Sequence, residues 1–266
     1  EDKVKVTDIF GMIKTNGALR IRLADMLFTG FIWNFLFATA TYYAKWAYCT
    51  DLTTGAVDTA KLGTFTMVSS LLMFFPLIIG TLVASPIMKA IGSPIRFHRV
   101  LILLEFVPGG ILFVLQMVGL LQSLPAVYLL CMGVCACAIG MDYIPGEVIN
   151  IEAMDYEIYK NGKDRSALCN AANKFLGKAQ SAVASGLVGV ILVAVGYEVD
   201  SATDTFLGEL SSIPVMLDWF IVIMGLIPFF LGLVGWLVLK RYPITDEIRA
   251  DMHEKLSGTS HAAGNT

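Results

Sequence analysis

The sequence is poor in charged residues. Asp, Glu, Lys and Arg make up only 15% of its 266 residues, whereas about 25% is usual in soluble domains. With a net charge of −3, the chain also lacks the basic excess with which proteins bind nucleic acid. Apolar residues instead account for 56% of the chain, and the mean hydropathy is +0.70. This composition predicts a membrane protein that lies in the lipid bilayer and does not bind nucleic acid.

Signatures of common enzymes are also lacking. No P-loop, no His-Glu-x-x-His and no Gly-x-Ser-x-Gly occurs, so we expect neither an enzyme nor a bound cofactor. Three of the five cysteines, Cys131, Cys135 and Cys137, cluster in one apolar segment. A metal site there needs further His or carboxylate ligands nearby. We therefore interpret these cysteines as small apolar packing residues and expect no metal site.

Six segments are long and apolar enough to cross a hydrocarbon layer about 30 Å thick, which takes roughly 20 helical residues each. Strands that span a membrane have only about 10 residues, so segments of this length predict helices and an all-α membrane protein. No cleavable signal peptide is visible at the start, because no uninterrupted apolar core precedes a small-residue cleavage site. The predicted spans are 22–48, 62–91, 99–121, 125–149, 172–197 and 213–239.

Basic residues gather on one side of these spans. Of the 19 Lys and Arg, only Lys45 and Lys61 fall on the other side. The positive-inside tendency therefore places both ends of the chain in the cytoplasm. We expect a multi-pass protein of the cell membrane, inner or plasma. Residues 1–21 form a cytoplasmic segment or linker, 22–239 the six-helix bundle, and 240–266 a cytoplasmic tail.

Ionisable residues at membrane depth are functional candidates, because each costs about 2.5–3.5 kcal/mol at a helix centre. Asp142 and Lys178 lie deepest. For Glu105, about two turns inside its span, a functional and an interfacial interpretation both remain open. Asp25 and Glu147 lie nearer the interface, where a side chain that reaches water is the simpler interpretation. All five fall in the cytoplasmic half of the predicted bundle.

The end of the fourth span is both acidic and helix-breaking. Pro145 removes a backbone donor and clashes with the preceding turn, which predicts a kink. Irregular backbone at this depth is tolerated where it lines a cavity or is buried in protein. A kinked helix that carries Asp142, Tyr143 and Glu147 is thus a candidate lining for a polar solute path. A packing kink without a solute is the alternative.

A polar stretch follows this span and reads DYEIYKNGKDR, with Asp155, Tyr156, Glu157, Lys160, Gly162 and Arg165 as its motif residues. Together with Lys178 and a Tyr-Pro-Ile-Thr-Asp-Glu sequence after the last span, it resembles the glycoside–pentoside–hexuronide:cation symporters, the melibiose-permease family of the major facilitator superfamily. That family has an Asp-Tyr-x-Glu-Trp-Lys-Thr-Gly-x-Arg loop between helices ten and eleven. Here the Glu and Arg are shifted, and Tyr159 and Asn161 stand in place of Trp and Thr.

The resemblance implies a transporter of twelve helices in two six-helix halves, with the substrate held between the halves near the bilayer midplane. The spans of this chain match the second half, so its expected partners are the N-terminal six-helix half of the same protein, the bilayer and a sugar-like substrate. The expected function is symport of the substrate with Na⁺ or H⁺ by alternating access. The coupling cation's site is expected mainly in the absent half.

The resemblance also implies site residues. Lys178 matches a lysine near the cation and sugar sites, and we expect it to pair with an acid of the other half or with Asp142. Tyr143 falls near an aromatic residue that contacts sugar in the family. For Trp33 and Asn34, at mid-depth in the first span, packing is the alternative. The predicted substrate and ion path consists of Lys178, Asp142, Tyr143, Glu147, Lys174, Trp33 and Asn34.

A different class of function also fits the composition. The fifth span carries the small-residue pairs Ala182 with Gly186 and Ser185 with Gly189, which favour close helix packing. Through such faces the chain would bind a partner chain as a six-helix scaffold or regulator that transports nothing.

Overall fold

The structure is a computed structural model that describes residues 6–263. Its regular elements are helical, and six of its helices are long and apolar enough to cross a membrane. The prediction of an all-α fold with six spans is confirmed. The parts of the predicted end segments before residue 6 and after 263 lie outside the described residues. The spans are α2 (Gly17–Tyr48), α3 (Thr59–Ile91), α4 (Pro94–Met117), α5 (Pro125–Asn161), α6 (Ser166–Ala194) and Ser212–Arg241.

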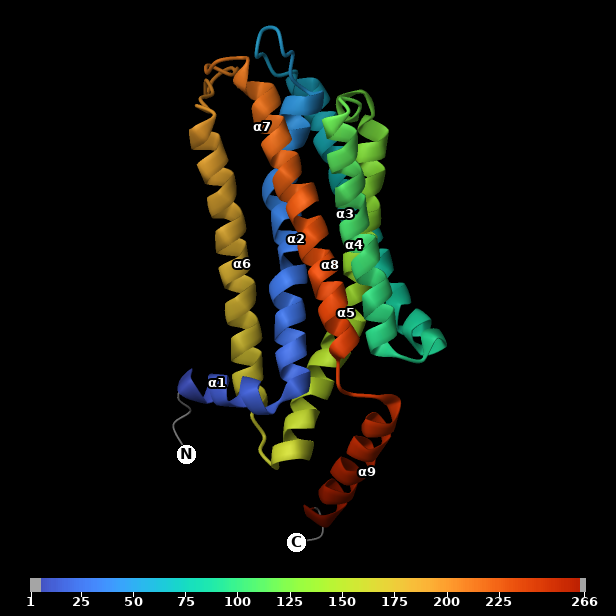
Figure 1. Cartoon of the computed structure of the whole chain (residues 1–266). Coiled ribbons are helices and arrows are strands. Elements are labelled where there is room, and N and C mark those ends of the chain that lie inside the picture. Colours follow the sequence, from blue (N-terminus) through green and yellow to red (C-terminus); the bar gives the residue numbers. More distant parts are fainter. Residues whose placement is uncertain (1–5, 264–266) are drawn as a thin grey trace.

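The spans run side by side along one long axis, as Figure 1 shows. Helix α2 packs against α5, α6 and α8, whereas α3 packs mainly against α5 and α6 mainly against α2. The short helix α1 (Val6–Thr15) and the last helix α9 (Asp246–Ala263) lie at one end of the bundle, together with the α5–α6 connection. Helix α6 is therefore covered by its own chain on one side only.

The first span begins earlier than residue 22, because Asn16 caps it. The side chain of Asn16 accepts a hydrogen bond from the backbone N–H of Leu19 at 2.9 Å. Its amide group also donates to the backbone oxygen of Ala153 on α5 at 2.9 Å. Asn16 is fully buried, so this cap also fixes α2 against the end of α5.

Helix α5 is longer than predicted. It continues past residue 149 to Asn161 and ends at Gly162, whose φ of 63° suits a left-handed cap. Most of the DYEIYKNGKDR stretch is thus helix rather than loop. The helix also runs through Pro145 without interruption, so the proline does not end the helix. Neighbouring elements bury both Pro145 and Gly146, and such packing supports a proline within a membrane helix.

The last span is not one regular helix. It consists of α7 (Ser212–Ile221), a π-helical turn (Val222–Leu226), α8 (Ile227–Val238) and a final 3-10 turn (Leu239–Arg241). Pro228 follows the π turn and has no N–H to donate to the preceding turn. The π turn also brings Gly225 against α4, where an added Cβ would lie 2.6 Å from the backbone oxygen of Gly109. Hydropathy alone did not predict this irregularity.

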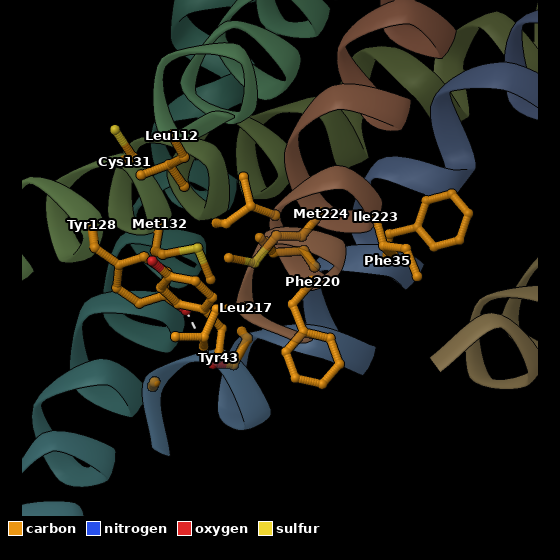
Figure 2. Packing of buried hydrophobic residues seen from close by; sticks show 14 of the residues in the cluster. Phe35, Tyr43, Leu112, Tyr128, Cys131, Met132, Leu217, Phe220, Ile223 and Met224 are labelled. Atoms are coloured by element: carbon orange, nitrogen blue, oxygen red, sulfur yellow. Dashed lines mark hydrogen bonds between the residues drawn. The ribbon is translucent and has the colours of Figure 1, made fainter. Parts of the chain in front are cut away.

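The main core joins α2, α4, α5, α6, α7 and the π turn, and Figure 2 shows some of its side chains gathered between these helices. Cys131 belongs to this core together with Tyr128 and Met132, and Cys135 is buried as well. All five cysteines are unpaired thiols. Within residues 6–263, no three His, Cys, Asp or Glu side chains converge in a way that would hold a metal ion.

A chain of hydrogen bonds crosses this core. The hydroxyl of Tyr43 donates to Gln116 Oε1 at 2.8 Å, and Gln116 Nε2 donates to Asp218 Oδ1 at 2.7 Å. Asp218 is an acidic residue at membrane depth on α7 that was not among the five ionisable residues predicted at this depth. Its position as the one charge in an apolar run was the available signal.

Small residues bring α3 and α5 together. A Cβ added to Gly80 would collide with the backbone oxygen of Cys137, and one added to Gly140 with that of Leu77. Gly186 and Gly189 of α6, by contrast, have open space where a Cβ would stand. The small-residue pairs of α6 therefore do not pack against the described part of this chain, and their contact with a partner chain stays a prediction.

Candidate functional site

A cavity of about 410 Å³ lies between α2, α5 and α6, with one side chain contributed by α4. Its wall is polar, acidic and aromatic rather than purely apolar. A second cavity, of about 150 Å³, lies between α2, α3 and α5 and is lined by apolar, aromatic and hydroxyl side chains without a charged group. The larger cavity is the candidate site. Its polar and charged lining comes from Arg22, Thr29, Asn34, Glu105, Asp142, Glu147, Asn150 and Gln180.

A buried ion cluster lies beside this cavity and contributes Arg22 and Asp142 to its wall. Arg22 donates to Asp25 Oδ2 at 2.6 Å, and His98 Nε2 lies 2.9 Å from the same oxygen. The other ring nitrogen of His98 contacts a carboxylate oxygen of Asp142. Asp25 is 0% exposed and His98 1% exposed. The cluster therefore joins α2, α4 and α5 through one imidazole, and the interfacial interpretation of Asp25 is wrong.

Arg22 extends the cluster toward the cavity mouth. Its Nε donates to Asn150 Oδ1 at 2.8 Å, and Asn150 Nδ2 donates to Glu147 Oε2 at 3.3 Å. Gly146 makes room for the guanidinium, since a Cβ there would lie 3.2 Å from one of its nitrogens. Glu147 itself is exposed, so it lies at the rim of the cavity.

Glu105 is an acidic residue of the cavity wall that takes no part in this network of hydrogen bonds and ion pairs. It is only 7% exposed and lines the cavity from α4. No hydrogen bond or ion pair joins its carboxyl group to any residue of the described range. A buried carboxyl group without a partner is costly, and such groups at membrane depth mark functional positions.

Two aromatic side chains stand over the cavity. Trp33 of α2 packs against Phe37, with ring centroids 3.7 Å apart. Tyr143 of α5 is 70% exposed although it lies within a span. Next to Trp33, the amide of Asn34 donates to the backbone oxygen of Gly30 at 2.8 Å. The structure thus brings Trp33, Asn34 and Tyr143 to one cavity.

Gln180 brings α6 to the same cavity. Its amide nitrogen donates to the backbone oxygens of Met26 and Leu27, at 2.6 and 3.1 Å. A Cβ added to Gly30 would lie 2.5 Å from Gln180 Oε1. Gly30 therefore permits the close approach of α6 to α2 at this depth.

The predicted lysines are not part of this wall. Lys174 and Lys178 are both exposed on α6, and neither lines the cavity. The predicted pairing of Lys178 with Asp142 is wrong for this structure, because Asp142 is held by His98. Within the described range, neither lysine takes part in an ion pair. An acid from outside this chain is the remaining expected partner.

The DYEIYKNGKDR residues lie at the end of α5, away from the cavity. Glu157 is 1% exposed, and Arg165 NH1 lies 3.6 Å from its Oε1. Lys160 lies over the rings of Tyr156 and Tyr159, with its Nζ 5.8 and 5.6 Å from their centroids. Asp155, on the same turn of helix, is half-buried. The shifted Glu and Arg of this motif therefore pair with each other.

Sequence reasoning did not predict several residues of the candidate site. His98, Arg22, Asn150 and Gln180 were not among the predicted site residues, although they hold or line the site. For His98 a signal existed, because it is one of only three histidines in the chain and precedes an apolar run that contains Glu105. For Arg22, Asn150 and Gln180, the direction of the side chain depends on how the helices are rotated, which the sequence does not show.

A family model described as MFS/sugar transport protein matches residues 1–246 of the chain. No curated protein matches the chain, and no solved structure matches it.

Proposed function

Because the chain belongs to the MFS/sugar transport protein family, we propose that it is the C-terminal half of a cation-coupled sugar symporter of the glycoside–pentoside–hexuronide type. Membership of a transporter family favours transport over a scaffold that only binds a partner chain. In this proposal the protein lies in the cell membrane with both ends of the chain in the cytoplasm. Its substrate is a sugar, glycoside, pentoside or hexuronide, which moves with Na⁺ or H⁺ by alternating access.

The observation that carries the proposal is the chemistry of the cavity. A sugar has apolar ring faces and hydroxyl edges, so it suits aromatic rings combined with amide and charged groups. Trp33 and Tyr143 offer the rings. Asn34 and Asn150 offer amide groups, and Arg22 lies beside them. The volume of about 410 Å³ is within the range of about 300–1,000 Å³ typical of small-molecule sites.

The proposed N-terminal half would cover what this chain leaves open. Helix α6 has its own chain on one side only, and Lys174, Phe175 and Lys178 are exposed on it. An exposed charge inside a membrane span requires water or an anionic partner. We therefore assign this side of α6 to the interface between the halves, with the sugar bound between them.

The end of α5 has a second role in this proposal. Rocking of the two halves would bring the Arg165 and Glu157 region against the other half when the transporter faces outward. Lys163 and Arg165 line a cavity of about 410 Å³ there, together with Gly11 and Thr15 of α1. These charges are the proposed closing contacts on the cytoplasmic side.

The test is uptake by the full-length gene product in membrane vesicles. Glycosides, pentoses and hexuronates are offered one at a time, with Na⁺ and H⁺ gradients applied separately. We expect one class to accumulate with one gradient, and we expect Trp33→Ala to weaken the apparent affinity for it. Trp219→Ala, at an exposed position on α7, is the matched control. Absence of any accumulation by correctly inserted protein would contradict the proposal.

A further inference from the structure

Glu105 has properties that the cavity lining alone does not explain. It is buried, it faces a cavity, and within the described range its carboxyl group has no partner. The acids around it differ, since Asp25 accepts from Arg22 and contacts His98, while Asp142 contacts His98. We propose that Glu105 is the site at which this half binds a proton, and that the coupling ion is H⁺. This inference rests on the proposed symport function.

The charges of the cluster support this assignment. Both ring nitrogens of His98 lie against carboxylate oxygens, which only accept hydrogen bonds. Nε2 also lies 3.3 Å from Arg22 NH1, but its contact with Asp25 Oδ2 is shorter, at 2.9 Å. These contacts favour a proton on each ring nitrogen and a cationic ring. Arg22 and His98 then balance Asp25 and Asp142. The cluster and Glu105 together have no net charge when Glu105 holds a proton, and they carry one negative charge when it does not. A net charge buried at this depth is unfavourable, so the balance favours a proton on Glu105.

The groups that face the cluster come from each neighbouring helix. Helix α2 contributes Arg22 and Asp25, α4 contributes His98, and α5 contributes Asp142. Glu147 lies at the rim. Helix α6 presents the neutral amide of Gln180. None of these adds a positive charge that would balance an ionised Glu105.

Glu105 and His98 differ in their access to the water of the cavity. Glu105 and Asp142 line the cavity, whereas His98 does not and is only 1% exposed. Water in the cavity can therefore deliver a proton to the carboxylate of Glu105 and take it away again. His98, held between two carboxylates, is a positioning residue that fixes Asp25 and Asp142.

A hard metal cation fits this wall poorly. Such ions require several oxygen ligands at once. Asp25 Oδ2 and one oxygen of Asp142 already contact Arg22 or His98. Within the described range, no three acidic, His or Cys side chains converge as a metal site would need. A proton needs only one carboxylate oxygen.

The proton and the sugar are linked through the water of the cavity. A sugar that enters displaces water, which leaves an ionised Glu105 without a partner. A protonated Glu105 is neutral and offers an O–H donor to a sugar hydroxyl. The proton therefore binds before the sugar on the outer side. After the sugar leaves toward the cytoplasm, water returns and the proton is released to it.

The first test reads the proton directly. Infrared spectra of the purified full-length protein at neutral pH are compared between wild type and Glu105→Gln. We expect the carboxylic acid carbonyl band of wild type to lose one component in this variant. Glu198→Gln, at an exposed acid in the α6–α7 connection, should leave the band unchanged. An identical band in wild type and Glu105→Gln would overturn the assignment.

The second test measures the coupling of proton uptake to sugar uptake in vesicles. Wild type should take up protons together with sugar and accumulate the sugar in a proton gradient. In Glu105→Gln, sugar exchange between the two sides should persist without dependence on pH, while accumulation and sugar-driven proton uptake are lost. Full accumulation by Glu105→Gln, or accumulation by wild type with a Na⁺ gradient alone, would overturn the inference.

Two further outcomes distinguish a failure of the Glu105 assignment from a failure of insertion or of the proposed function. If Glu105→Gln does not insert, Glu105→Asp retains a titratable acid and should retain proton uptake with a shifted pH dependence. Proton uptake with an unshifted pH profile in that variant would contradict the assignment. Wild type that exchanges no sugar at all would refute the proposed function, whereas the infrared comparison would still decide whether Glu105 holds a proton.

Discussion

At the scale of single residues, His98 holds the site together. Its two ring nitrogens contact carboxylates from α2 and α5, while its own backbone belongs to α4. Without the imidazolium, Asp142 loses its only ion-pair partner within the described range. Removal of one partner from a buried pair costs more than the pair contributes, because a charge stays buried without compensation.

His98→Gln should therefore destabilise the protein strongly. Glutamine keeps one donor group but carries no charge, so we expect a loss of about 3–5 kcal/mol of unfolding free energy. Thermal unfolding of the detergent-solubilised protein measures this effect as a lower melting temperature. His253→Gln, at an exposed position on α9, is the matched control. Equal melting temperatures for the two variants would contradict the bridging role of His98.

At the scale of elements, α9 is docked on the end of α5 by polar contacts. Arg249 Nε donates to Glu152 Oε1 at 2.6 Å, and the Tyr159 hydroxyl donates to Asp251 Oδ2 at 2.5 Å. Met252 is buried in the same contact region. The hydrogen bonds from Tyr159 and Lys255 hold the pKa of Asp251 below its usual range, and the bond to Glu152 raises the pKa of Arg249.

Docking of α9 should therefore depend on pH and on Arg249. A lowered pKa of Asp251 means that its contribution is complete above its ordinary pKa and is lost as pH falls through the lowered value. The protection of amides in 246–256 against hydrogen exchange, relative to the intrinsic exchange rate at each pH, should therefore fall at acidic pH. Arg249→Ala should accelerate exchange at neutral pH, whereas Arg241→Ala, at an exposed residue without a contact to Glu152, should not. Equal exchange rates in both variants would contradict this docking.

At the scale of the whole molecule, α6 is the element that most needs a partner. It packs mainly against α2, and Lys178 is exposed about 18 Å along the helix from its start, at 1.5 Å per residue. A lysine at this depth is costly unless water or an acid meets it. In the proposed full-length transporter, the other half supplies that environment.

Lys178→Ala in the full-length protein should abolish accumulation of sugar while leaving insertion intact. Its charge then no longer meets the proposed acid of the other half. The measurement is uptake against a gradient, with the amount of inserted protein determined in parallel. Lys61→Ala, at an exposed lysine near the start of α3, is the control. Normal accumulation by Lys178→Ala would refute the proposed role.

The sequence by itself determined the solvent, the number of spans and some of the cavity residues on α2 and α5. These depend on local properties, since hydropathy and length decide whether a helix crosses a membrane. Asp142 and Glu147 were predicted as charged residues at membrane depth, and Trp33, Asn34 and Tyr143 with the family resemblance. One cavity contains all five. The resemblance of the polar stretch pointed to the superfamily that the family match supports.

Only the tertiary structure decided which charges meet. Whether Asp142 pairs with His98 or Lys178 depends on the rotation of α5 and α6 and on how closely they approach α2. Gly30 sets that approach, because a Cβ there would collide with Gln180. Such contacts join residues far apart in the chain, so no local pattern predicts them. The isolation of Glu105 became visible for the same reason, once all its neighbours had found other partners.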